Sequence, residues 1–361
     1  MASFASLPPE LVEEIVELAV PPFETRTYAE RAVFLRGLCL VSKQLLPAAR
    51  RLLYREMRIA SSASSDLVSG AKFPGGRLPA VRHLLVEHSR YTGPAWEKKD
   101  DRTRLSKLLR EVKPEVLSVY SSCELPMEDL QGTSTLHLAA FPFSSHSFTR
   151  EQPLRLASIR RLTLFDVRID EPDLVLTAAN FPNLVSIYCE DTYSGEPDED
   201  EGSSDGDVDL LYFSKRWIPL IPQLTALASP RLGLIAEGSS LSVLETEFQW
   251  VPSEEDLSVL PSSLRVLRIV YGCYAMPWEA SHFASFLLLL RSPLFPHALS
   301  ELHLAEAGNR RPQMDAGLVE VEEWCAAHGV ALHLDCAPFE SPWTSFWRFL
   351  DGVKDRLGLD V

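Results

Sequence analysis

Residues 156–165 read LASIRRLTLF, and residues 181–190 read FPNLVSIYCE. Toward the end of both segments apolar residues alternate with polar ones, which is the period of a β-strand with one buried face. Related, and in some cases shorter, patterns recur in eight further segments: 78–87, 115–121, 134–140, 221–228, 241–248, 264–270, 299–305 and 330–335. The chain is therefore expected to contain ten strands of one type.

The spacing of these segments indicates a repeat. From Leu84 to Leu332 the mean interval is about 28 residues, which lies in the range of leucine-rich repeats although individual intervals vary. Segments between the strands, such as 281–290 and 318–327, have helical spacing. We expect an α/β fold in which residues 61–340 form an irregular leucine-rich-repeat solenoid with a parallel sheet on its concave face. The alternative is an ordinary two-layer α/β domain with leucine-rich parallel strands.

The outward positions of these strands are candidates for binding. The leucines of each strand should point into the core, so the residues between them point out onto the concave face. Charged and aromatic groups are mixed there, which suits a polar peptide or a folded protein surface. The predicted target-binding residues are Arg161, Phe165, Tyr188, Glu245, Arg268, Glu301 and His303. Further outward positions are His83, Glu87, Ser118, Tyr120, His137, Thr163, Glu190, Glu247 and His333. The alternative is a solvated sheet face without a ligand.

Residues 1–60 have a different pattern, that of three short helices. Ser6 is placed to cap the first, and Ser42 to cap the third. Leu11, Ile15 and Leu18 recur at i, i+4 and i+7, which gives one apolar stripe. So short a segment carries more apolar positions than it can bury, which predicts an exposed face for a partner.

Two stretches of this region, LPPELVEEIVEL (7–18) and LRGLCLVSKQLLPAARRLLYREMRI (35–59), resemble the F-box of fungal F-box proteins that carry leucine-rich repeats. The resemblance implies docking onto the Skp-type adaptor of a cullin ubiquitin ligase, and hence a substrate-recognition subunit. The residues implied in adaptor binding are Leu7, Pro8, Leu11, Ile15, Leu38, Val41 and Leu45. Two features depart from the family: the spacer 20–30 is longer than the usual short turn, and leucine replaces a frequent tryptophan in the third helix. The alternative is a helical cap on a stand-alone leucine-rich-repeat scaffold.

The charge and cysteine content restrict the partners and the compartment. The net charge is −15, and no basic stripe is present to neutralise phosphates, so we expect no nucleic-acid partner. Eight carboxylates lie between Glu196 and Asp209, and we expect a disordered acidic insertion at 194–209. The longest apolar run, 283–290, is too short to cross a bilayer, so no membrane partner is expected. Six scattered cysteines fit free thiols in the cytoplasm or nucleus.

Two segments have ligand types that suit metals. Asp205, Asp207 and Asp209 alternate as in a calcium loop, but Leu210 stands where that loop requires glycine. The segment CAAHGVALHLDC (325–336) offers two cysteines and two histidines, yet a helix, a glycine C-cap and a strand explain it without zinc. We therefore expect no metal.

We expect neither an enzyme nor a cofactor. The sequence holds no Walker loop, dinucleotide fingerprint, G-x-S-x-G elbow or H-E-x-x-H motif. At the C-terminal end, residues 341–361 show apolar residues at helical spacing. We predict a capping helix there, packed on the last exposed edge of the array; a partner-binding or membrane helix is the alternative.

Overall fold

The computed structural model describes the following residues: 7–21, 27–60, 81–87, 99–120, 127–140, 142–143, 155–165, 167–169, 175–190, 193–194, 217–229, 240–247, 260–271, 280–307, 316–337 and 342–361. They belong to two compact units, Met1–Pro142 and Phe143–Val361. The predicted acidic insertion, its candidate calcium ligands and Ser6 lie outside the described residues, apart from Ser194. The domain boundaries at 60 and 340 stay predictions.

Unit 1 begins with three helices, α1 (Pro9–Ala19), α2 (Tyr28–Val41) and α3 (Leu46–Arg55). Ser42 does not cap α3 itself, because the helix starts at Leu46 and its N-cap position is Leu45; the Ser42 hydroxyl instead accepts a hydrogen bond from the backbone N–H of Gln44 (3.2 Å), in the turn before the helix. The three helices share one small core, which consists of Val12, Val16, Val20, Leu35, Ala48, Ala49 and Leu52.

Four parallel strands follow in unit 1, and each pairs with the next. They are β1 (Glu56–Ala60), β2 (His83–Glu87), β3 (Val116–Tyr120) and β4 (Thr135–Ala139), with helix α5 (Lys99–Val112) and the 3₁₀ turn η3 (Met127–Asp129) in the connections. The sequence analysis missed β1 and α5. β1 follows α3 without a turn, so its few residues show no boundary signal.

Unit 2 continues the same design with seven parallel strands in the order β6-β8-β10-β11-β12-β13-β14. Their bounds are Arg161–Phe165, Ser186–Glu190, Ala226–Ala228, Val243–Glu247, Val266–Tyr271, Glu301–Ala307 and Ala331–Ala337. Unit 2 also contains η5 (Ile218–Gln223), α8 (Ala280–Leu290), α9 (Ala316–His328), α10 (Pro342–Leu357) and the short strands β7 (Arg168–Ile169) and β9 (Tyr193–Ser194). The short strand β5 (Pro142–Phe143) spans the boundary between the units.

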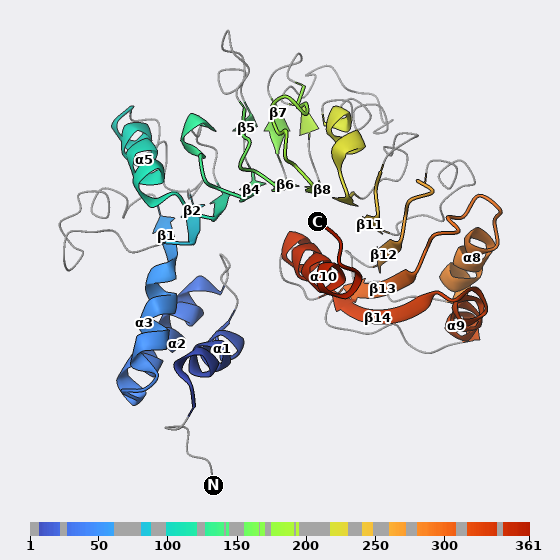
Figure 1. Cartoon of the computed structure of the whole chain (residues 1–361), viewed down its shortest axis with the longest axis horizontal. Coiled ribbons are helices and arrows are strands. Elements are labelled where there is room, and N and C mark those ends of the chain that lie inside the picture. Colours follow the sequence, from blue (N-terminus) through green and yellow to red (C-terminus); the bar gives the residue numbers. More distant parts are fainter. Residues whose placement is uncertain are drawn as a thin grey trace, which may run out of the picture. The chain divides into compact units, whose positions relative to one another are not determined.

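The fold is mixed α/β with parallel strands, which confirms that part of the expectation, and each of the ten predicted segments contains a strand. The alternation is also as predicted in the clearest copies: Leu162, Leu164, Leu302 and Leu304 are fully buried. In unit 2, α10 lies on the inner side of the strands, whereas α8 and α9 lie on the opposite side (Figure 1).

The cysteines that the structure describes with their side chains, Cys39, Cys189 and Cys325, do not form disulfides. Within the described part of the chain, no helix combines the length and the apolar composition needed to cross a bilayer.

Candidate functional site

The C-terminal helix α10 covers the outward face of the unit 2 strands. On β6, Trp347 Nε1 donates a hydrogen bond to Thr163 Oγ1 (2.9 Å), and the ring of Trp343 packs on Phe165 with 4.7 Å between centroids. The amphipathic helix predicted for 341–361 is therefore present, but its predicted place at the end of the array is wrong. The strand face offers both apolar contacts and hydrogen-bond partners to the aromatic side of the helix.

A buried ion pair lies under the middle of α10. Arg268 Nη1 donates to Glu245 Oε2 (2.5 Å), and its Nη2 donates to Ser345 Oγ of α10 (3.0 Å). The guanidinium also lies over the ring of Phe349, 4.8 Å from its centroid. Only 2% of Arg268 is exposed, so this charge is shielded from solvent by the helix.

The structure thus brings the predicted target-binding residues together and covers most of them. These side chains point outward as expected. They are not accessible to a target as expected, because α10 covers this face of the strands. Five of them are buried: Tyr188, Glu245, Arg268, Glu301 and His303. Arg161 and Phe165 are partly buried, and Arg161 pairs with Asp351 of α10 (2.6 Å). A period-two pattern gives the direction of a side chain but not what lies above it.

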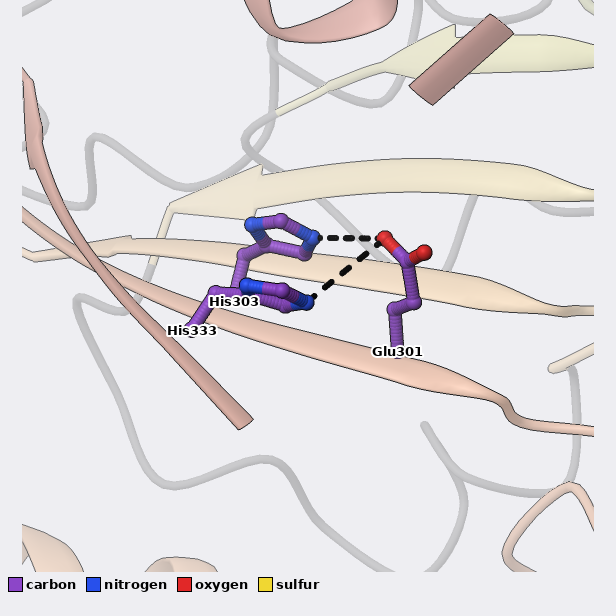
Figure 2. A group of neighbouring side chains, drawn as sticks. All are labelled: Glu301, His303 and His333. Atoms are coloured by element: carbon purple, nitrogen blue, oxygen red, sulfur yellow. Dashed lines mark hydrogen bonds and ion pairs between the residues drawn. The ribbon is translucent and has the colours of Figure 1, made fainter. Parts of the chain in front are cut away.

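Near the end of α10, Glu301 accepts contacts from several groups at once. Its Oε2 lies 3.0 Å from His303 Nε2 and 3.9 Å from His333 Nε2, and both dashed lines in Figure 2 end on this oxygen. Arg356 Nη2 of α10 donates to the same atom (2.8 Å). The other ring nitrogen of His303, Nδ1, lies 2.8 Å from Asp335 Oδ2.

The surroundings change the acidity of this cluster. Burial acts to raise the pKa of Glu301, but the hydrogen bonds and the electrostatic attraction of Arg356 and His303 together outweigh it and hold the pKa below its usual value. Burial is also the largest single influence on Asp335, but the hydrogen bond from His303 and the attraction of His303, Arg268 and His333 together lower its pKa. The pKa of His333 is lowered, first by burial and then by the neighbouring His303. Both carboxylates therefore stay ionised.

Among the described residues, one group of three could hold a metal ion. The ligand atoms of Glu301, His303 and His333 all lie within 4.8 Å of one another. The imidazole rings of the two histidines, from neighbouring positions of β13 and β14, stack with 4.3 Å between centroids and an angle of 14°. The sequence analysis placed all three outward but missed their convergence, which needs the register of two strands that lie about 30 residues apart.

The segment considered for zinc folds as a helix end, a turn and a strand. Gly329 has φ +70°, and Cys325 is buried on α9, where burial first of all raises the pKa of its thiol to about 11. The ring of His328 stacks on Trp324 with 4.2 Å between centroids. The side chain of Cys336 lies outside the described residues.

The N-terminal helices present a second candidate surface. On α1, Val12 and Val16 face the core, whereas Leu11, Ile15 and Leu18 are exposed, with 82% of Leu18 accessible. The predicted stripe is therefore correct as a stripe and points outward. On α2, Leu40 and Val41 are also exposed, and other exposed large apolar residues of these helices are Val33, Phe34 and Tyr54.

The residues implied in adaptor binding separate into two groups. Pro8, Leu11, Ile15 and Val41 are exposed. Leu7, Leu38 and Leu45 are partly buried and pack against the helical core. Leu7, Leu38 and Leu45 therefore stabilise the helical core in addition to any part they have in a partner-binding surface.

A buried ion pair joins these helices to the first strand. Arg31 of α2 donates to both carboxylate oxygens of Glu56, at 2.5 and 2.7 Å, and also to the carbonyl oxygen of Pro21. Burial outweighs the attraction of Arg31 and raises the pKa of Glu56. The sequence analysis missed this pair, because charged residues 25 positions apart in sequence give no periodic signal.

Comparisons with known proteins do not assign a family. No protein-family model matches the chain, and no curated protein matches it significantly.

Proposed function

We propose that the chain is the substrate-recognition subunit of a Skp-cullin-F-box ubiquitin ligase, acting in the cytoplasm or nucleus and not as an enzyme. Helices α1–α3 bind the Skp-type adaptor, and the strand-bearing units hold a protein target. The observation that carries the proposal is the outward apolar stripe Leu11–Ile15–Leu18, which the chain itself leaves exposed. Exposed apolar groups clustered on one helix face mark interaction surfaces more often than chance placement.

The target surface is proposed on the same grounds of accessibility. Because α10 buries most of the predicted residues of unit 2, the half-buried outward positions of unit 1 are the better candidates. These are His83, Glu87, Ser118, Tyr120 and His137. Arg58 and Glu87 form an ion pair among them (2.6 Å between Arg58 Nε and Glu87 Oε2).

The test is binding of the purified full-length chain to a Skp-type adaptor. Ile15→Asp should abolish complex formation at micromolar concentration, because a carboxylate would have to be desolvated in an apolar interface. Leu288→Asp is the matched control, since Leu288 is 70% exposed on α8 of unit 2. It should leave adaptor binding unchanged.

The alternative, a stand-alone interaction scaffold, would show itself in the same experiment. A folded wild-type chain that does not bind the adaptor, in the presence of an F-box control that does, would exclude the ligase role. Equal loss of binding in Ile15→Asp and Leu288→Asp would mean that the effect is not specific to α1.

A further inference from the structure

We propose that Glu301, His303 and His333 form a binding site for a divalent transition-metal ion of the zinc class, which competes with the guanidinium of Arg356. The proposal concerns unit 2 alone and does not depend on the ligase role.

The distances from Glu301 Oε2 to the two histidine nitrogens suit one small ion, and all three ligand atoms lie within 4.8 Å of one another. Zinc lies about 2.0–2.1 Å from nitrogen and oxygen ligands in a tetrahedral site, so neighbouring ligand atoms are about 3.3 Å apart. Glu301 Oε2 lies 3.0 Å from His303 Nε2 and 3.9 Å from His333 Nε2, which brackets that value. The rings are nearly parallel, so His333, which is only partly buried, must tilt for both lone pairs to point at one ion.

The second ring nitrogen of His303 is already held as in a metal site. Histidine ligands usually donate their other N–H to a carboxylate, which orients the ring and makes the ligating nitrogen more basic. His303 Nδ1 lies 2.8 Å from Asp335 Oδ2, so Nδ1–H can donate to Asp335 while Nε2 faces Glu301. The ligands also stand on two adjacent paired strands, where His303 lies opposite His333, so the site has a rigid base.

The charge of the cluster can be balanced in two ways. Without a metal, the guanidinium of Arg356 lies against the carboxylate of Glu301 and balances its charge. With a divalent ion, the charge of the metal takes the place of the guanidinium. The side chain of Arg356 is 45% exposed, so it can turn into solvent when the ion enters. Metal and arginine therefore exclude each other on Glu301.

The experiment is a titration of the metal-free, full-length protein with Zn²⁺ by calorimetry, with Co²⁺ absorption as a report on the ligand field. We expect one zinc ion per chain. Arg356→Ala should bind zinc more tightly, because it removes the competing cation. His333→Ala should bind about 100-fold more weakly or not at all, since loss of a ligand costs at least as much as loss of an outer partner. His328→Ala, an exposed histidine outside the site, should bind as the wild type does.

Several outcomes would overturn the proposal. Absence of stoichiometric binding in both the wild type and Arg356→Ala would do so, as would binding that His333→Ala leaves unchanged. Loss of binding in His328→Ala would place the metal in the 325–336 segment instead. Circular dichroism checks the fold of each variant, and if His333→Ala does not fold, the comparison of wild type with Arg356→Ala decides.

Discussion

Helices α1 and α10 are both amphipathic, but they differ in what covers their apolar side chains. In α10, Phe346, Leu350 and Val353 are fully buried against the strands of unit 2. In α1, one apolar row is buried in the helical core, while the row of Leu11 and Ile15 remains exposed. The same kind of sequence pattern thus has a partner within the chain in one case and leaves a face free in the other.

This difference separates two uses of an apolar helix face. The α10 face contributes to the stability of unit 2, because its burial removes apolar area from water on folding. Among the described residues the outer α1 face makes no such contribution, since its side chains are exposed, and it becomes stabilising when another molecule covers it. Substitutions of the buried α10 side chains should therefore lower the stability of unit 2. Substitutions on the outer α1 face should instead weaken association with a partner and leave the stability nearly unchanged.

The largest expected effect is that of Phe346→Ala. The ring is fully buried and packs against Tyr188, with 5.8 Å between centroids. Its removal leaves a cavity between helix and sheet, and we expect a loss of about 4 kcal/mol in the free energy of unfolding. Urea denaturation of the full-length chain measures it.

Phe34→Ala in α2 is the matched control, because this phenylalanine is 38% exposed. Its loss should stay below about 1 kcal/mol, in proportion to the smaller area it buries. If the two substitutions cost the same, α10 is not packed on the sheet as described.

The second-largest effect on stability is expected at the buried ion pair between Arg31 of α2 and Glu56 of β1. Glu56→Ala removes the charge partner and both hydrogen-bond acceptors of the Arg31 guanidinium and leaves that group buried, and breaking such a pair costs about 3 kcal/mol. The control is Glu13→Ala, which breaks the exposed ion pair with Arg51 and should cost less than about 0.5 kcal/mol. Thermal or urea unfolding compares the two variants, and a loss of equal size would show that Glu56 is not shielded.

The strands were the most predictable part of the molecule. Each parallel strand must bury its apolar side chains against its neighbours, so the period-two pattern recurs visibly and each predicted segment contains a strand. The stripe on α1 was predictable for the same reason. Its direction was not, because Val12 and Leu11 both have apolar neighbours at helical spacing, and the pattern alone does not say which row faces the core.

The position of α10 and the convergence of Glu301 with His333 could not be predicted in this way. Trp347 and Thr163 are 184 residues apart, and nothing local in either segment specifies their contact. Such pairs depend on tertiary packing, which composition and periodicity do not encode. The outward strand face of unit 2 was consequently predicted to be open to a target, although α10 covers it.

A smaller, pH-dependent effect is expected in unit 1. Burial and then the charge of Arg55 lower the pKa of His83 to about 4, whereas an unfolded chain has a value near 6.5. The folded state therefore binds this proton more weakly, so the stability contribution is complete above about pH 6.5 and is lost as the pH falls toward 4. Glu115 opposes the shift, while Arg31 and Arg82 add to it. The difference in unfolding free energy between wild type and His83→Gln should shrink across this window, and a difference that is constant with pH would contradict the shift.

The smallest expected effect on stability is the sharpest test of the comparison. Leu18 and Leu40 are 82% and 88% exposed, so the double variant Leu18→Ser/Leu40→Ser should change the free energy of unfolding by less than about 0.5 kcal/mol. It should nevertheless weaken binding to a Skp-type adaptor and reduce self-association in sedimentation experiments. Both kinds of association require another molecule to cover the same outward side chains. A loss of several kcal/mol would mean that the chain already covers these leucines. The α1 face would then be a folding surface like that of α10, and the argument for a partner would lose its basis.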